Sequence, residues 1–304
     1  MKALYPRFAL PALLAAACAA SALAEGPAPA ASTAAAAGLR LLPGIEAEMR
    51  AADGWTIKGT YLPAKPGERT FILVHGAGMR RQVWRVLALR LQRAGLGYLS
   101  LDLRGHGQSA AGPDGKLASW RKFKATKTEN DFADMTLDIQ AAFSYLSGQG
   151  VPEESAGLIG TDVGGSLALK YAAVHPKVPM IVLLSPGMNY QEILTVNAMR
   201  VYRDRPILMI YSELERSSAK ATPLLYEIAR RSAGERNATL ISVGDRRGVR
   251  LMTGPLARRI VEWLLNPVKP EALAPSTSTL FAPPAESSGA LDDEESGAEP
   301  RAEP

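Results

Sequence analysis

The chain has few of the residues that stabilise small disulfide-bonded or metal-bound folds. Its 304 residues include one cysteine, Cys18, and three histidines, at positions 75, 106 and 175. A single cysteine excludes an internal disulfide framework and a zinc site built from cysteines. Three histidines are a thin supply for catalysis or metal binding. We therefore expect no metal and no other cofactor.

Apolar residues are not scarce, and the charge is unevenly distributed. The apolar fraction of 47% excludes a wholly disordered chain, and the length suits one large domain or two small ones. From Glu271 onward there are eight acidic residues and one arginine, a net charge of −7. The net charge of the whole chain is +5, so residues 1–270 carry +12. The sequence therefore predicts an acidic tail on a basic body.

The N-terminal segment has the features of a processing signal. Lys2 and Arg7 precede an apolar stretch over residues 8–20, which is too short to span a bilayer comfortably. The small-x-small sequence Ala22-Leu23-Ala24 follows. We predict a secretory signal peptide over residues 1–24 and a flexible linker over residues 25–43. The alternative is an alanine-rich leader without a sorting function.

Cys18 leaves a second route of processing open. The run LLAAAC resembles the lipoprotein box of bacteria, although Ala15 stands where leucine is usual. Lipidation of Cys18 would anchor the protein to a membrane, whereas cleavage after Ala24 would release it. Both readings place the protein beyond the inner membrane of a bacterium, as a periplasmic, outer-membrane or secreted protein.

Strand and helix patterns alternate between residues 44 and 267, which we predict to be one domain. Strands are expected at 45–52, 55–62, 70–75, 98–103, 158–160, 180–184, 207–211 and 239–243, and helices at 82–94, 131–147, 166–174, 223–232 and 255–265. This order predicts an α/β fold with a mostly parallel sheet and helices on both faces. Residues 268–304 are rich in proline, alanine, serine and glutamate, and we expect them to be disordered.

Four motifs in this order carry a resemblance to a known superfamily. They are His75-Gly76, the run DLRGHGQS at 102–109, GTDVGG at 160–165 and RPILMIYSELE at 205–215. Together they resemble the oxyanion turn, the loop after the fourth strand, the nucleophile elbow and the acid-bearing strand of the α/β-hydrolase fold. The segment between Gly187 and Asp204 is short, so we expect a short or absent lid.

The resemblance assigns roles to residues at the carboxyl ends of the strands. Asp162 stands in the nucleophile position, where serine is usual, and Glu215 stands in the acid position. Haloalkane dehalogenases and epoxide hydrolases use aspartate there, because a carboxylate can attack an alkyl carbon to form an ester. The backbone N–H groups of Ala77 and Val163 would form the oxyanion hole.

The histidine that this chemistry requires is missing from its expected place. The best alignment puts Arg247 there, and no histidine follows His175. A guanidinium remains protonated and has no lone pair to accept a proton, so it cannot act as a general base. Ser166 and Ser185 have no base within their own motifs. We predict that Arg247, or else Arg246 or Arg250, points toward Asp162 or Glu215.

Basic residues gather in the loops at the carboxyl ends of the predicted strands, where ligands bind in sheets of this kind. Their positive charge would attract an anionic ligand, although a solvated rim is the plainer interpretation. Trp120 and Phe123 lie among lysines and arginines, but export argues against nucleic acid as a partner. The candidate ligand-binding residues are Arg80, Arg81, Arg104, Arg246 and Arg250.

Two functions remain open at this point. The first is an exported, monomeric protein with a degenerate triad that binds an anionic ligand or partner. The second is an active hydrolase of the ester, epoxide or haloalkane class that uses Asp162 as nucleophile. The missing histidine favours the first, because loss of one triad member lowers the rate by about 10⁴-fold.

Overall fold

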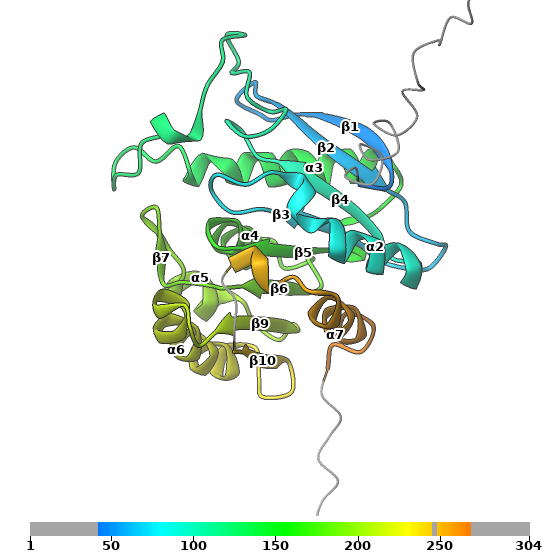
Figure 1. The fold of residues 1–304 in the computed structure, drawn as a ribbon, viewed down its shortest axis with the longest axis vertical. Coiled ribbons are helices and arrows are strands. Elements are labelled where there is room, and N and C mark those ends of the chain that lie inside the picture. Colours follow the sequence, from blue (N-terminus) through cyan, green and yellow to red (C-terminus); the bar gives the residue numbers. More distant parts are fainter. Residues whose placement is uncertain (1–41, 245–247, 269–304) are drawn as a thin grey trace, which may run out of the picture.

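An eight-stranded sheet forms the centre of the computed structural model, which describes residues 42–244 and 248–268 (Figure 1). The strand order is β1-β2-β4-β3-β5-β6-β9-β10. The strands are β1 (Ile45–Arg50), β2 (Thr56–Leu62), β3 (Thr70–Val74), β4 (Gly97–Asp102), β5 (Ala156–Thr161), β6 (Ile181–Leu184), β9 (Ile207–Ser212) and β10 (Ala238–Val243). β2 pairs antiparallel with β1 and β4, and the other pairs are parallel. The predicted sheet and its leading hairpin are confirmed.

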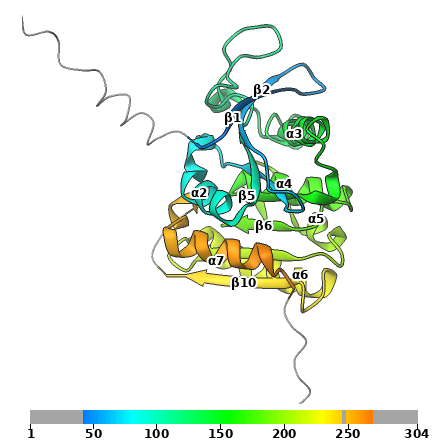
Figure 2. The ribbon, with the colours of Figure 1, turned by 90° about the vertical axis from the view of Figure 1, so that its right-hand side faces the viewer.

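Helices cover both faces of this sheet, as Figure 2 shows. α2 (Arg85–Ala94) and α7 (Gly254–Leu265) pack together on one face. On the other face lie α3 (Thr136–Gly148), α4 (Val163–Val174), α5 (Val196–Val201) and α6 (Arg216–Ser232). Every residue of β3 is buried, which explains why its sequence TFILV is continuously apolar rather than alternating.

The helices differ from the sequence prediction mainly at their first turns. α6 begins at Arg216 rather than at Pro223, so the proline lies inside the helix. Proline is a strong stop signal in sequence analysis, but packing of the amphipathic α6 against the sheet outweighs the lost backbone hydrogen bond. Short 3-10 turns occur at Arg81–Trp84, Trp120–Lys122, Ala133–Met135, Glu153–Ser155 and Gly248–Leu251.

The connection from β6 to β9 is short and carries a small hairpin that the sequence did not indicate. The hairpin is formed by β7 (Asn189–Tyr190) and β8 (Ile193–Leu194), and α5 follows it. Strands of two residues have no periodicity that sequence analysis could detect. Asn130, in the long connection after β4, donates a hydrogen bond to the Gln191 carbonyl at 2.7 Å. The two connections therefore meet above the carboxyl ends of the strands.

Several sequence predictions fall on residues that the structure does not describe. The signal peptide, Cys18 and most of the linker lie within residues 1–41, which the structure does not describe. The acidic tail, predicted over residues 268–304, is also outside the described residues, except for Val268. Among the described residues, no helix is both long enough and apolar enough to cross a bilayer. Export, lipidation and tail disorder therefore remain predictions.

Candidate functional site

Asp162 occupies a strained turn between β5 and α4. Its backbone angles are φ 52° and ψ −124°, a region that costs about 1–3 kcal/mol for a residue other than glycine. The Asp162 N–H donates to the Leu184 carbonyl, and the Asp162 carbonyl accepts from the amide of Gly165. These hydrogen bonds hold the turn, so the side chain is presented at the carboxyl edge of the sheet.

Gly164 allows α4 to lie directly against β3. A Cβ atom at this position would come within 2.4 Å of the carbonyl oxygens of Val74 and His75. No side chain fits in that space, which explains why the second half of the motif requires glycine. The elbow geometry suggested by GTDVGG is therefore present, with an aspartate at its tip.

The Asp162 carboxylate lies over the turn that follows β3. A Cβ atom on Gly76 would be 2.9 Å from Asp162 Oδ2, so glycine makes room for the carboxylate there. The Thr161 hydroxyl donates to the same oxygen at 2.9 Å. Burial raises the pKa of Asp162 to about 6; the Thr161 hydrogen bond opposes this shift, and the negative charge of Glu215 adds to it.

Glu215, which follows β9, is held by two serine hydroxyls. Ser185 Oγ donates to Glu215 Oε2 at 2.7 Å, and Ser218 Oγ donates to the same atom at 3.1 Å. The Tyr190 hydroxyl donates to the Ser185 carbonyl at 3.2 Å. Burial raises the pKa of Tyr190 to about 12, and the charges of Asp162 and Glu215 contribute, so the phenol stays neutral. The sequence did not indicate the contact of Ser185 with Glu215 or that of Tyr190 with Ser185.

Both ring nitrogens of His75, and both of His106, contact backbone groups. His75 Nε2 accepts from the Leu103 amide at 3.1 Å, and its Nδ1 lies 2.8 Å from the Gly76 carbonyl. His106 Nε2 accepts from the Gly78 amide at 2.9 Å, and its Nδ1 lies 2.9 Å from the Arg104 carbonyl. Burial lowers the pKa of His75 to about 3 and also lowers the pKa of His106. This geometry fits a structural role for both histidines.

His175 lies at the opposite end of α4 from Asp162. Its ring stacks on Tyr171, with 3.9 Å between ring centroids, and its Nδ1 lies 3.1 Å from Glu153 Oε1. All three histidines of the chain fall within the described residues. No imidazole is therefore placed to activate a water molecule at Asp162.

The two amides of the expected oxyanion hole are available. Within the described residues, neither the Ala77 nor the Val163 amide donates a hydrogen bond. Val163 is the first residue of α4, and Ala77 follows the glycine that contacts Asp162. Helix N-termini carry partial positive charge, which favours an oxygen acceptor at this position. We call the group formed by Asp162, Glu215, Ser185, Tyr190 and these two amides the elbow site.

Two of the predicted ligand-binding arginines lie inside the protein instead. Arg104 is 3% exposed and pairs with Asp138 at 2.8 Å and with Asp53. Arg81 is 2% exposed and pairs with Glu46 at 2.8 Å, and its charge also lies near Asp102. The carboxylates that neutralise these arginines come from distant parts of the chain. The sequence could not reveal these pairs, and the prediction that these two arginines bind a ligand is corrected.

Of the other arginines predicted to lie at the site, two are described by the structure and two are not. Arg80 and Arg250 are exposed. Among the described residues, no ion pair joins Arg250 to Asp162 or Glu215. Arg246 and Arg247 lie outside the described residues, so a cation in the former histidine position remains a prediction.

Other chemistries find little support around the elbow site. Ser166 is 2% exposed and its hydroxyl has no hydrogen-bond partner among the described residues, which agrees with a packing role. Those residues also contain no cluster of three or more histidine, cysteine, aspartate or glutamate side chains suited to a metal ion.

Comparison with known proteins identifies the fold. The family model for the alpha/beta hydrolase fold matches residues 69–213. No curated protein sequence matches the chain significantly. A dienelactone hydrolase from Anabaena variabilis is 19% identical, with a TM-score of 0.57 over 74% of this chain and 99% of that chain.

Two further solved structures have similar folds. The alpha/beta hydrolase GrgF from a Penicillium species is 15% identical, with a TM-score of 0.60 over 75% of this chain and 99% of its own. Est1E from Butyrivibrio proteoclasticus, solved with ferulic acid bound, is 13% identical, with a TM-score of 0.56 over 72% of this chain and 99% of its own. The sheet order, the strained elbow and these comparisons agree that the chain has the α/β-hydrolase fold.

Proposed function

We propose that this protein is an exported, monomeric, non-catalytic member of the superfamily that binds an anionic ligand at the elbow site. The observation that supports this most directly is the placement of the histidines. His75 and His106 use both ring nitrogens on backbone groups, and His175 lies at the far end of α4. The elbow site therefore lacks the imidazole that activates the nucleophile and water in a catalytic triad.

The groups that remain suit binding of an oxygen-bearing anion. The amides of Ala77 and Val163 would donate to one oxygen of a carboxylate, sulfonate or carbonyl group. The protonated Asp162 side chain would donate to a second oxygen, and its pKa of about 6 sets the pH below which this form predominates. Exposed cations near the carboxyl ends of the strands, Arg80, Arg216 and Arg250, would attract the anion. Nucleic acid is not part of the proposal.

An active hydrolase is the second candidate, and one observation favours it. The strained turn presents a carboxylate beside two free amides, as nucleophilic attack on an alkyl carbon would require. The first half of such a reaction forms an ester on Asp162 and releases the leaving group. The second half needs water deprotonated by a base, and the described residues place no histidine at Asp162 for this step.

We expect no turnover of short p-nitrophenyl esters above a buffer blank. A fluorophosphonate probe should leave the protein unlabelled, because the elbow carries no serine. Incubation with 1-bromobutane followed by intact mass measurement then separates the candidates, with Asp162→Asn as the matched control. An adduct at Asp162 that persists for hours would mean that only the second half-reaction is lost. Repeated turnover that disappears in Asp162→Asn, or probe labelling at Ser166 or Ser185, would contradict the proposal.

Binding of an anion at the elbow site should weaken as the pH rises. Above a pH of about 6, Asp162 becomes negatively charged and repels the ligand, whereas below that pH it is a neutral hydrogen-bond donor. For 1-butanesulfonate, which stays charged throughout, we expect affinity to fall about 10-fold between about pH 5 and about pH 7.5. Calorimetric titration measures this change. The Asp162→Asn variant should show a nearly flat profile, and an equally steep fall in that variant would assign the effect to another group.

A further inference from the structure

A basic arm projects from the carboxyl edge of the sheet. It consists of residues 110–130 in the connection between β4 and α3, and Figure 1 and Figure 2 show this connection extending beyond the neighbouring loops. The arm contains five lysines and arginines and two carboxylates, so its net charge is +3. Two short turns, closed by the bridges Ala111–Leu117 and Ala125–Asn130, flank the 3-10 turn Trp120–Lys122.

Aromatic side chains hold the arm against the body of the protein. The Trp120 ring lies against Gly78, where a Cβ atom would be 2.8 Å from Trp120 Cζ2. The same ring stacks on His106, with 5.6 Å between ring centroids. Phe123 contacts Phe132 edge-on at 5.6 Å. Packing therefore explains the two aromatic residues that the sequence places among the cations.

The fold gives no such explanation for the leucine and the unpaired cations of the arm. Leu117 is 87% exposed, and an apolar side chain of this size costs free energy when water surrounds it. Two of the five cations pair with the two carboxylates of the arm itself. The other three are exposed and form no ion pair within the part of the chain that the structure describes: Arg121, Lys122 and Lys127.

Two more exposed leucines lie at the same edge. Leu194 is in the β7–β8 hairpin and Leu214 is in the turn after β9, so they follow the carboxyl ends of the neighbouring strands β6 and β9. The hydrogen bond from Asn130 to the Gln191 carbonyl joins this hairpin to the basic arm. The edge therefore presents apolar side chains together with positive charge.

Positive charge and exposed leucines around a projecting arm suit a soft, negatively charged surface. We propose that the basic arm is a docking site for an anionic lipid bilayer, a role that does not depend on the elbow site. The unpaired cations would be attracted to the lipid phosphates. Leu117 would enter the boundary between headgroups and acyl chains, where its burial is favourable. A rigid protein partner is a poorer match, because a stable protein interface needs about 800 Å² from each side and a narrow arm offers little flat area.

Cosedimentation with lipid vesicles tests this proposal. The full chain is measured beside residues 25–304, because the apolar stretch over residues 8–20 would itself bind lipid. The shorter form keeps every described residue, and circular dichroism checks that its fold is unchanged. We expect both forms to bind vesicles of phosphatidylcholine with about 30% phosphatidylglycerol. The shorter form should not bind phosphatidylcholine alone, and about 0.5 M NaCl should release it from the anionic vesicles, because salt screens the attraction.

Two variants of the shorter form separate the apolar and the charged contributions. Leu117→Ser should weaken vesicle binding about 10-fold, because it removes the side chain that enters the bilayer. Lys122→Gln combined with Lys127→Gln should weaken binding about 30-fold, since each cation near an anionic surface contributes a factor of about 5. All three side chains are exposed and outside the core, so these changes should leave the fold intact.

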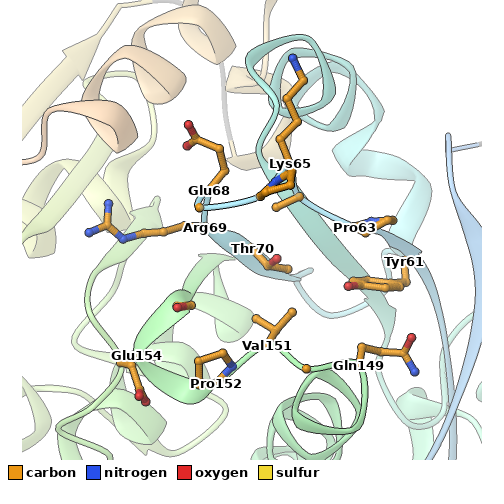
Figure 3. Close-up of a pocket in the computed structure, with 15 residues that line it drawn as sticks. Tyr61, Pro63, Lys65, Glu68, Arg69, Thr70, Gln149, Val151, Pro152 and Glu154 are labelled. Atoms are coloured by element: carbon orange, nitrogen blue, oxygen red, sulfur yellow. The ribbon is translucent and has the colours of Figure 1, made fainter.

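Matched controls make the same kinds of change at the amino edge of the sheet. Val174→Ser replaces another exposed apolar residue, and Lys65→Gln combined with Lys177→Gln removes two exposed lysines. Figure 3 shows Lys65 on the rim of a pocket at that edge, on the segment that also carries Glu68 and Arg69. Each control should bind the anionic vesicles within about 2-fold of the unsubstituted protein.

Every outcome decides for or against the bilayer site. Binding that requires phosphatidylglycerol and that falls in both arm variants but in neither control supports it. The proposal is overturned if the shorter form does not sediment with anionic vesicles, if Leu117→Ser binds as tightly as the unsubstituted protein, or if the arm and control variants lose affinity equally. Retention on heparin without vesicle binding would also overturn it, and would indicate a soluble polyanion as the partner of the arm.

Discussion

Replacing Arg104 by methionine is expected to lower the free energy of unfolding by about 3–5 kcal/mol. The guanidinium donates to Asp138, whose side chain is fully buried, and it also pairs with Asp53. Methionine fills much of the same volume but leaves the Asp138 carboxylate without a counter-ion in a low-dielectric environment. Urea unfolding at about pH 7 measures the change.

Two control variants distinguish the buried pair from a general effect of losing positive charge. Arg80→Met removes an exposed arginine nearby in the sequence and should change stability by less than about 0.5 kcal/mol. The double variant Arg104→Met with Asp138→Leu removes both charges and should recover most of the loss. If Arg104→Met unfolds at the same urea concentration as the wild type, the ion pair does not stabilise the fold in the way that its burial indicates.

Asp162→Asn is expected to stabilise the protein by about 1–3 kcal/mol at about pH 7.5. Folding raises the pKa of Asp162 from 3.8 to about 6, which means that the folded protein disfavours the charged form. The neutral acid carries no such penalty below pH 3.8, and the penalty is complete once the pH exceeds about 6. Asparagine accepts the same Thr161 hydrogen bond without the charge.

The pH profile is the decisive measurement for this variant. Its advantage over the wild type should vanish at about pH 4 and grow as the pH rises through about 6. Asp204→Asn is the matched control, since Asp204 has the same φ of 52° but an exposed side chain. An advantage of equal size at both pH values would show that Asp162 is not destabilised by its charge.

Much of the elbow site could be predicted because its residues follow one another in the chain. GTDVGG places a strand end, a tight turn and a helix start within six residues, and the structure has each of them. Glu215 was found in the same way, as the residue that ends the loop after β9. Its contact with Ser185 was not found, because a hydrogen bond between the segments that follow β6 and β9 leaves no mark on local sequence.

The sequence by itself determined the α/β class, the alternation of strands with helices and the absence of any histidine after His175. These follow from local periodicity, from motif spacing and from a count of three histidines. Only the tertiary structure decided that Arg81 and Arg104 are internal rather than ligand-facing, since Glu46, Asp53 and Asp138 reach them from distant segments.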